Sequence, residues 1–495
     1  MPENKAINLI NRAKTWPNRT AVISSGQAYT YQNLLDSSAA IAQSLLGERA
    51  NLKETRIAFM VEPGFEYVAT QWGIWRSGGI AVPLCTAHPL PALQYTLEDS
   101  QAEVVLADDK YFEMLRPLCQ SLHLPFFQLD QLSDASTSLP SISVERRAMI
   151  LYTSGTTSKP KGVVSTHRNI ESQITTLVEA WQWQPDDHIL NILPLHHVHG
   201  IINILSCALW SGACCEFLPK FDAAMVWNLF QKGQINVFMA VPTIYYKLID
   251  YWEKAEKTEQ KAMSAALRPF RLMVSGSAAL PVSTLEKWKA ISGHTLLERY
   301  GMTEIGMALS NPYNGERKPG HVGLPLPGVE MRLVDSDNQP VKKGDPGEIQ
   351  IKGPSVFREY WNKPKATQEA FVDGWFKTGD IAQLNEGSYK ILGRNSVDII
   401  KSGGYKISAL EIEEILRTHP YIKECAIVGL PDPEWGELIA ACLVKKDKNP
   451  DIEAINSWLR ERLPGYKLPR KFLIRDDLPR NTLGKVTKNE LKKMF

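Results

Sequence analysis

A segment rich in hydroxyls, glycines and lysines follows a short apolar run in the first third of the chain. It reads Tyr152-Thr-Ser-Gly-Thr-Thr-Ser-Lys-Pro-Lys-Gly-Val163, and the apolar run covers Ala148 to Leu151. Glycines let a ligand approach the backbone closely, and successive N–H groups form a concavity that binds anions. The segment therefore predicts a loop that binds a polyphosphate, although it lacks the Walker A spacing. The alternative interpretation is a polar surface loop.

Four further segments carry residues suited to the same chemistry: Tyr300-Gly-Met-Thr-Glu304, Phe376-Lys-Thr-Gly-Asp380, Gly393-Arg394 and Pro479-Arg-Asn-Thr-Leu-Gly-Lys485. In this order, and together with the phosphate loop, they resemble the adenylate-forming (AMP-binding) superfamily of acyl-CoA synthetases, peptide-synthetase adenylation domains and luciferases. The resemblance covers nearly the whole chain. It implies that ATP activates a carboxylic acid as an acyl-adenylate, and that the acyl group then passes to coenzyme A with release of AMP.

The resemblance also implies roles for single residues. Charge builds on the α-phosphate in the transition state, so the site must supply cations and fixed donors. Thr303 would bond the α-phosphate, Glu304 would ligate Mg²⁺, and Lys485 would lie between the carboxylate and the α-phosphate. The remaining nucleotide-binding residues would be Thr153, Ser154, Gly155, Thr156, Thr157, Lys161, Gly276, Ser277, Ala278, Tyr300 (on adenine), Gly301, Asp380 (on the ribose) and Arg394.

Lys485 lies far in sequence from the phosphate loop. It can act only if a small C-terminal domain folds over the rest of the chain. Without the other motifs, an isolated Gly-Lys pair would be interpreted as an ordinary surface lysine.

Arg299 stands where most relatives carry a small residue, directly before Tyr300. A buried guanidinium needs a carboxylate partner, and a second carboxylate on the substrate would supply one. With His196, the gating histidine His197, and Ser275 or Ser277, it resembles the acyl pocket of malonyl-CoA synthetases. Malonate or methylmalonate is the expected acid. The alternative is that Arg299 pairs with Glu298 or Glu304 and that the pocket takes an ordinary short or aromatic acid.

The three histidines at 196, 197 and 199 also raise the question of zinc, but their spacing and the absence of a nearby cysteine argue against it.

A segment similar to the family's pantetheine tunnel would bind CoA through Lys401, Ser402, Gly403, Gly404 and Tyr405. Relatives usually have two residues between the Arg and the Asp of the hinge, whereas here three separate Arg394 from Asp398. The hinge is therefore either Ser396 or Val397.

The elements that must position these residues follow from the pattern of the chain. Up to about Val241, short apolar runs alternate with helical stretches, which predicts βαβ units and parallel sheets. After Gly320, short alternating runs with Gly, Pro and Asp turns predict antiparallel strands. We expect an α/β protein with the adenylate-forming enzyme fold. Its large domain, residues 1–395, would hold two α/β subdomains and a small β-barrel-like one; a mobile α+β domain, residues 396–495, would follow.

Composition excludes several function classes. The chain has 495 residues, 44% hydrophobic and 22% charged, with a formal net charge of +2. A balanced charge gives no field that would mark a nucleic-acid or membrane-surface protein, and no apolar stretch is long enough to span a membrane. Seven scattered cysteines favour a reducing compartment, and the N-terminal segment carries no targeting pattern, so a cytoplasmic location is expected. Small molecules are the expected partners, and the sequence predicts no oligomeric state.

Three other functions stay open from the sequence. One is a broad short- or medium-chain, or aromatic, acyl-CoA ligase. Another is a stand-alone amino-acid adenylation domain, which Asp222 supports poorly because it lies beyond the expected segment. The third is a nucleotide-binding protein without catalysis, which would have no need of Lys485.

Overall fold

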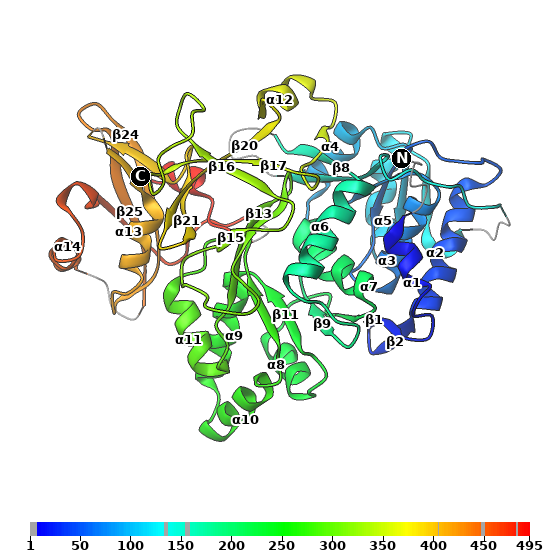
Figure 1. The fold of residues 1–495 in the computed structure, drawn as a ribbon, viewed down its shortest axis with the longest axis horizontal. Helices are drawn as coiled ribbons and strands as arrows, with labels where there is room; N and C mark the ends of the chain where they lie inside the picture. The colour runs from blue at the N-terminus through cyan, green and yellow to red at the C-terminus, as the bar shows by residue number, and fades with distance from the viewer. Residues whose placement is uncertain (1–6, 133–136, 154–158, 404, 447–450, 482–483) are drawn as a thin grey trace.

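The computed structural model describes residues 7–132, 137–153, 159–403, 405–446, 451–481 and 484–495 (Figure 1). Four sheets organise them, and the expected fold class is confirmed. Two large sheets with their helices form the bulk of the chain. An antiparallel sheet follows, and the last sheet lies at the C-terminal side of the molecule.

The seven-stranded sheet has the order β18-β8-β7-β4-β3-β5-β6. Its strands β3 to β7 pair in parallel, whereas β8 and β18 are antiparallel additions. The bounds are β3 Arg56–Met60, β4 Ile80–Pro83, β5 Val104–Ala107, β6 Phe126–Gln128, β7 Arg147–Thr153, β8 Lys161–Thr166 and β18 Glu359–Tyr360. The helices around it are α2 Tyr31–Leu46, α3 Phe65–Arg76, α4 Leu90–Ser100 and α5 Asp109–Ser121, followed by the short 3₁₀ helix Leu129–Gln131.

The nine-stranded sheet has the order β15-β14-β13-β12-β11-β9-β10-β1-β2. Its bounds are β1 Thr20–Ser24, β2 Gln27–Thr30, β9 His188–Asn191, β10 Cys214–Phe217, β11 Val237–Ala240, β12 Leu272–Ser275, β13 Leu297–Met302, β14 Gly306–Ser310 and β15 Leu324–Pro325. The helices are α1 Asn8–Ala13, α6 His167–Ala180, α7 Cys207–Ser211, α8 Ala223–Gln231, α9 Pro242–Lys254, α10 Lys257–Leu267 and α11 Val282–Ser292. A π-helix, His199–Ser206, precedes α7.

One buried apolar cluster joins the two large sheets. It contains side chains from both, for example Ile57 and Met149 of one sheet and Val22 and Val237 of the other. The helix α3 is buried on nearly all sides, as expected of a helix that lies between two layers. Helices α4 and α5 cover the opposite face of the seven-stranded sheet with a second cluster.

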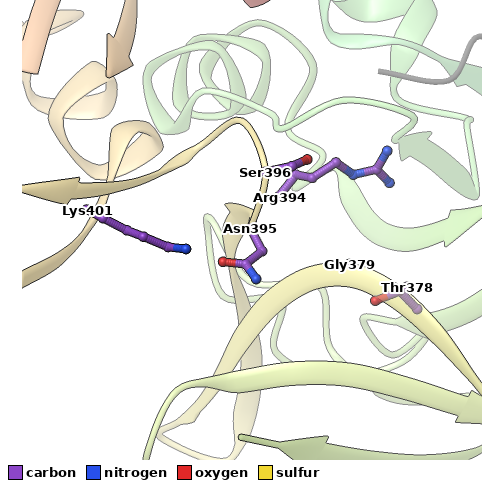
Figure 2. Close-up of a pocket in the computed structure, with 6 residues that line it drawn as sticks. All are labelled: Thr378, Gly379, Arg394, Asn395, Ser396 and Lys401. Carbon is purple, nitrogen blue, oxygen red and sulfur yellow. The ribbon is translucent and has the colours of Figure 1, made fainter. Parts of the chain in front are cut away.

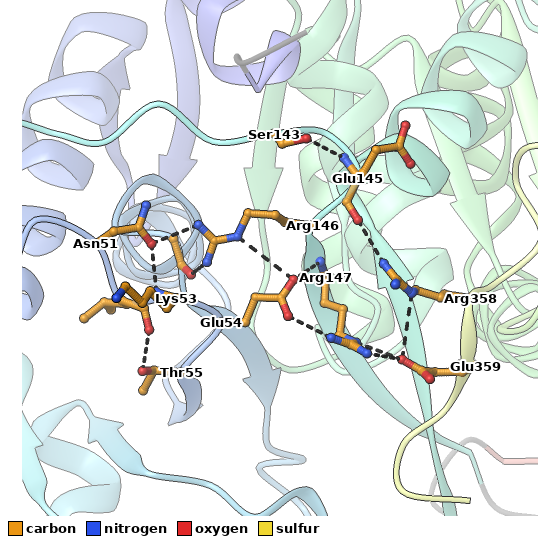
Figure 3. Close-up of polar contacts among 12 residues, drawn as sticks. Asn51, Lys53, Glu54, Thr55, Ser143, Glu145, Arg146, Arg147, Arg358 and Glu359 are labelled. Atoms are coloured by element: carbon orange, nitrogen blue, oxygen red, sulfur yellow. Dashed lines mark hydrogen bonds and ion pairs between the residues drawn. The ribbon is translucent and has the colours of Figure 1, made fainter. Parts of the chain in front are cut away.

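The antiparallel sheet contains β16 Glu330–Val334, β17 Gly347–Lys352, β19 Phe371–Val372, β20 Trp375–Asn385 and β21 Ser388–Arg394, with the helix α12 Pro364–Glu369. It has its own apolar core around Ile349, Phe357 and Phe376. A polar network nearby joins distant parts of the chain (Figure 3). Arg147 of β7 pairs with Glu54 at 2.8 Å and with Glu359 of β18 at 2.7 Å.

The C-terminal sheet contains β22 Ile399–Ser402, β23 Tyr405–Ser408, β24 Ile422–Asp432, β25 Gly436–Lys445 and β26 Lys471–Arg475. Its helices are α13 Ala409–Leu416, α14 Ile452–Arg460 and α15 Lys488–Lys492, with a 3₁₀ turn at Gly465–Lys467. Apolar cores cover both faces of this sheet. The chain passes from the third sheet to the fourth between β21 and β22, which is where the proposed boundary at residue 395 falls.

Sequence signals explain several helix starts. Ser408 caps α13 by accepting a hydrogen bond from the backbone of Glu411, and Asp451 caps α14 in the same way. Side-chain oxygens at the N-cap satisfy N–H groups that have no partner within the helix.

Candidate functional site

The candidate site lies where several parallel strands of the nine-stranded sheet end. The register pairs Ala240 with Ser275 and Ser275 with Glu298. The segments that continue from these strands therefore emerge at one edge of the sheet, which is where open α/β sheets usually bind ligands. This topology brings Gly276 and Ser277 beside Arg299.

Arg299 is a buried cation that has no carboxylate partner among the residues that the structure describes. Its side chain keeps 4% of its surface exposed, its Nη2 donates to Ser277 Oγ at 3.3 Å, and its Nε has no acceptor in the described part of the chain. A Cβ on Gly276 would lie 2.4 Å from the Arg299 Cζ, so only glycine fits against this guanidinium. Burial lowers the pKa of Arg299 to about 9.

The alternative pairing of Arg299 with a neighbouring glutamate is wrong in this structure. Glu298 instead accepts a hydrogen bond from the Gly320 backbone at 2.8 Å, and Glu304 accepts one from the Tyr360 hydroxyl at 2.9 Å. No ion pair of Arg299 occurs within the described ranges. A buried guanidinium without a carboxylate is costly, which fits a group that pairs with an anionic ligand.

A second polar side chain beside Arg299 is His199, which the sequence did not assign to the pocket. Its Nδ1 lies 3.1 Å from Ser277 Oγ, the same oxygen that accepts from Arg299. His199 also begins the π-helix, and such wide turns are frequent at functional sites. The three-histidine segment was noticed in the sequence, but nothing there showed which ring would face Arg299.

The predicted His196 and His197 lie together, with ring centroids 4.1 Å apart, and His88 lies 6.0 Å from His196. Burial lowers the pKa of His197 to about 4, with contributions from Lys485 and His88, so the imidazole is neutral near pH 7. The Nε2 atoms of His196, His197 and His199 are buried without a hydrogen-bond partner in the described residues. They are available to a ligand.

Ser275 and Ser277 differ in what they contact. Ser275 is buried, and its Oγ has no partner in the described part of the structure. Ser277, not Ser275, contacts Arg299, and its backbone has a φ of 69°, a left-handed conformation that is strained for serine. Next to it, Gly276 is buried and Ala278 is exposed.

Asp380 lies on the predicted nucleotide side of the site, and each of its carboxylate oxygens already accepts one hydrogen bond. Its Oδ1 accepts from Arg394 Nε at 2.9 Å, and its Oδ2 accepts from the Tyr300 hydroxyl at 2.6 Å. Asp380 and Arg394 face each other across β20 and β21, which explains the ion pair. Each carboxylate oxygen can accept a further bond, so ribose hydroxyls still have acceptors here.

Glu304 and Thr303 lie in the turn between β13 and β14. Glu304 is buried, and burial raises the pKa of its carboxyl, an effect that the Tyr360 hydrogen bond and the charges of Arg394 and Lys161 oppose. Thr303 is half-buried. A Cβ on Gly301 would meet the Gly306 carbonyl oxygen at 2.2 Å, so this tight turn requires glycine.

The ends of the phosphate loop meet in the β7–β8 hairpin. Thr153 pairs with Lys161 in register, and the Lys161 ammonium lies 4.8 Å from the centroid of the Tyr360 ring. Tyr360 in turn contacts Glu304, so the loop's exit strand reaches the turn that holds Glu304. The predicted residues Ser154, Gly155, Thr156 and Thr157 lie outside the described residues.

Lys485 faces the site from the C-terminal part of the chain. Its pKa is lowered to about 8, first by burial and then by Arg394 and Arg299, while Asp380 opposes the effect. The residue as a whole is nevertheless exposed to water. A Cβ on the preceding Gly484 would lie 3.4 Å from Thr243 Oγ1 at the start of α9. The fold thus brings Lys485 close to the Arg299 pocket and to Asp380.

The predicted CoA loop lies beside an open pocket between the third and fourth sheets (Figure 2). Lys401 lines this pocket with Thr378, Gly379, Arg394, Asn395 and Ser396. Ser402 is buried, and Gly403 donates its N–H to the Trp435 carbonyl at 2.9 Å. Tyr405 is 54% exposed and stacks on Tyr466 with centroids 4.4 Å apart, whereas Gly404 lies outside the described residues.

The candidate hinge residues lie in a turn held by Asp398. The Asp398 carboxylate accepts from the Arg394 N–H at 3.1 Å and from Lys488 Nζ at 2.6 Å. The N–H groups of Val397 and Asp398 both donate to the Arg394 carbonyl. The choice between Ser396 and Val397 stays a prediction.

In the described ranges, no helix is both long enough and apolar enough to cross a membrane. The same residues contain no group of three or more His, Cys, Asp or Glu side chains that could hold a metal ion. A Mg²⁺ ion bound with a nucleotide needs only one or two protein carboxylates, because phosphates and water supply the other oxygens. The buried Glu304 carboxylate fits that requirement.

Known proteins resemble this chain along nearly its whole length. A malonate–CoA ligase ACSF3, mitochondrial, of Xenopus laevis is 45% identical over 98% of this chain and 91% of its own. The human malonate–CoA ligase ACSF3, mitochondrial, is 43% identical over 99% and 92%. The ATP-bound crystal structure of MatB from Rhodopseudomonas palustris superposes with a TM-score of 0.90 at 34% identity and covers 99% of this chain and 98% of that one.

The family comparison agrees with the order of the motifs. Residues 9–361 match the family described as AMP-binding enzyme, and residues 411–485 match the AMP-binding enzyme C-terminal domain. The first match contains the phosphate loop and Arg299, and the second ends at Lys485. The chain belongs to the AMP-binding enzyme family.

Proposed function

We propose that this protein is an AMP-forming acyl-CoA synthetase whose preferred acid is malonate, with methylmalonate as the nearest alternative. The observation that carries the choice of acid is the buried Arg299, which has no carboxylate partner among the described residues and shares Ser277 Oγ with His199. The malonate–CoA ligases among its relatives support the same acid.

In the first half-reaction, one malonate carboxylate oxygen attacks the α-phosphorus of ATP. The new O–P bond forms as the bond to pyrophosphate breaks, which gives malonyl-adenylate. Lys485 would hold the attacking carboxylate and the α-phosphate, and Thr303 would donate to the same phosphate. The neutral His197 lies close to Lys485 and adds no positive charge to compete with it.

The second malonate carboxylate would lie against Arg299, Ser277 and His199. This contact supplies the charge that the buried guanidinium lacks. An acid such as acetate has no second carboxylate, so it would leave Arg299 buried and unpaired, and sites of this kind reject the smaller substrate strongly. Succinate or a longer diacid would need more space between its two carboxylates.

The nucleotide would lie on the side of Asp380, Tyr300 and Arg394, with its ribose on Asp380 and its phosphates toward Thr153 and Lys161. When Mg²⁺ is bound, it neutralises phosphate charge and polarises the P–O bonds. Glu304 is the described residue that would hold it. The predicted phosphate-loop residues 154–157 belong to the same proposal.

In the second half-reaction, the CoA sulfur attacks the acyl carbon of malonyl-adenylate, and the bond to the AMP oxygen breaks. The thiol proton is released, and AMP leaves with its phosphate charge restored. Lys401, Ser402, Gly403 and Tyr405 would line the path of CoA. The proposed division into residues 1–395 and 396–495 lets the second part carry both Lys485 and this loop.

The cytoplasmic location expected from the sequence stays a prediction. The names of both vertebrate relatives place those proteins in mitochondria.

The proposal is tested with the purified protein and a panel of acids. AMP and pyrophosphate release is measured with ATP, Mg²⁺ and CoA over malonate, methylmalonate, acetate, benzoate and succinylbenzoate. Malonate should give the highest kcat/KM and malonyl-CoA as product. Equal turnover of acetate and benzoate would favour the broad-specificity ligase, and binding of ATP without turnover of any acid would favour a non-catalytic nucleotide-binding protein.

A further inference from the structure

A carboxylate of the C-terminal part caps a helix of the large α/β part. Glu414 Oε1, from α13, accepts a hydrogen bond from the backbone N–H of Val282 at 2.9 Å. Val282 is the first residue of α11, and the N-cap Pro281 offers no side-chain acceptor. Helix N-termini carry N–H groups without internal partners and attract negative charge. Figure 1 shows the ends of α11 and α13 meeting.

Glu414 is connected to the turn between the third and fourth sheets by a chain of charged groups. It pairs with Arg417 at 3.6 Å, and Arg417 pairs with the neighbouring Glu413 at 3.0 Å. From there the buried Lys488 links Glu413 to Asp398, with both contacts at 2.6 Å. These ion pairs lie inside the C-terminal part, so they fix Glu414 to the same body that carries Lys485.

Lys485 lies three residues before Lys488 in this body. Two contacts join its surroundings to the α9 and α11 helices: Gly484 lies close to Thr243, and Glu414 accepts from Val282. Tyr405 of the predicted CoA loop is exposed and stacks on Tyr466 within the C-terminal part. The Glu414 contact therefore belongs to the orientation in which Lys485 lies near Arg299 and Asp380.

We propose that Glu414 is a positioning residue that latches the C-terminal part in the orientation in which Lys485 faces the acid and the α-phosphate. This inference rests on the proposed function. The latch favours adenylate formation, the step for which Lys485 is proposed. Its chemistry suits reversible closure, because one carboxylate meets one backbone N–H at a site that is partly open to water.

The charge of Glu414 also affects a residue next to Arg299. The pKa of Glu298, next to Arg299, is raised to about 8, mainly by burial and further by the charge of Glu414, while the Gly320 hydrogen bond opposes the shift.

The test compares the two half-reactions in Glu414→Ala and Glu414→Gln. Adenylation is measured without CoA as malonate-dependent ATP–pyrophosphate exchange, and thioester formation is measured from preformed malonyl-adenylate with CoA. In Glu414→Ala, exchange should fall roughly five- to twentyfold, the shift expected from loss of one charge-assisted hydrogen bond. Thioester formation should stay within about twofold. Glu414→Gln retains an oxygen acceptor and should recover part of the loss.

Glu411→Ala is the matched control. Glu411 lies on the same helix but pairs with Lys467 inside the C-terminal part, at 2.6 Å and 2.7 Å. Glu411→Ala should change neither the rate of ATP–pyrophosphate exchange nor the rate of thioester formation. If Glu414→Ala lowered both half-reactions equally, or neither, the latch would be overturned while the proposed function stood. If the unaltered protein showed no exchange with any acid, the proposed function would fail first.

A distance measurement tests the latch without activity. Spin labels on Met225→Cys in α8 and Ile474→Cys in β26, both exposed positions, report how the two parts lie, in a Cys214→Ser background that removes the least buried native cysteine. The unaltered latch should give one narrow distance distribution with ATP bound, and Glu414→Ala should broaden it. Identical narrow distributions in both proteins would contradict the latch.

Discussion

Two arginines on the two sides of the candidate site, Arg394 partly buried and Arg299 buried, differ in how their charge is balanced. Arg394 pairs with Asp380 at 2.9 Å, and the pKa of its guanidinium is raised by that carboxylate in spite of burial. Within the described ranges, Arg299 has only the Ser277 hydroxyl as a side-chain partner, at 3.3 Å, and burial lowers its pKa to about 9. The charge of Arg394 is balanced within the protein, whereas that of Arg299 is free to pair with an anionic ligand.

The same contrast extends to their neighbours. Tyr300 and Asp380 satisfy each other beside Arg394, so the nucleotide side is preorganised before a ligand arrives. Around Arg299, the Nε2 of His199 and the Oγ of Ser275 are buried without a partner in the described part of the chain. Polar atoms left without partners in a protein interior are costly. The acyl side is therefore the part whose structure depends most on its substrate.

The largest expected effect comes from Lys485, which lies within electrostatic reach of both arginines. Lys485→Ala should lower ATP–pyrophosphate exchange by about three orders of magnitude, since a preorganised donor to a developing charge is lost. Thioester formation from preformed malonyl-adenylate should remain. Lys493→Ala, at an exposed lysine of the same segment, is the control. Normal exchange in the Lys485 variant would remove this residue from the reaction.

The next effect separates Arg299 from Arg394. Arg299→Met should lower kcat/KM for malonate roughly a hundredfold or more, because a buried charge pair with the substrate is lost, and should change acetate turnover little. It should also raise the free energy of unfolding by about 1–3 kcal/mol, since an unpaired buried cation is removed. Acid-panel kinetics and urea unfolding measure both. Equal losses for every acid would exclude Arg299 from substrate choice.

Asp380→Asn tests the paired side of the comparison. The change removes the negative charge that pairs with Arg394 and replaces one of the two acceptor oxygens by a donor. The KM for ATP should therefore rise roughly ten- to hundredfold with malonate specificity intact. The free energy of unfolding should fall by about 1–3 kcal/mol, opposite in sign to Arg299→Met. If the two variants shifted stability in the same direction, the contrast between the two arginines would be wrong.

The smallest effect concerns pH. The pKa of Lys485 is lowered to about 8, so its ammonium is present below this pH and is lost as the pH rises through it. The kcat/KM for ATP in the adenylation step should therefore fall roughly eightfold between pH 7.5 and pH 9, as the free-enzyme pKa dictates. In Lys485→Arg, residual activity should persist to higher pH, because a guanidinium stays charged. A profile that is flat up to pH 10 in the unaltered protein would contradict this assignment.

Much of the fold could be predicted because its signals are local. Capping residues and apolar periodicity act over a few positions, and Ser408, which caps α13, is one such signal. The tight turn at Gly301 likewise follows from its own sequence, which admits no side chain there.

Contacts between residues far apart in the chain could not be predicted from local sequence signals. The sequence offered Ser275 and Ser277 as equals, and only the left-handed backbone at Ser277 turns its hydroxyl to Arg299. The sequence has three histidines in one segment. In the structure, His199 at the start of the π-helix is the one that contacts the Ser277 hydroxyl. The Glu414 contact with Val282 had no sequence signal, because a backbone N–H carries none.

The amino-acid sequence by itself determined the family, through five motifs in a fixed order, and it determined that a cation would stand beside the acyl pocket. The residues of each motif lie within a few positions of one another, so the motif can be recognised from the sequence alone. Only the tertiary structure decided that this cation has no internal carboxylate, that Asp380 is shared by Tyr300 and Arg394, and that Lys485 faces both. Those facts depend on the order of strands in the sheets and on how the C-terminal part meets α9 and α11, which spacing along the chain does not encode.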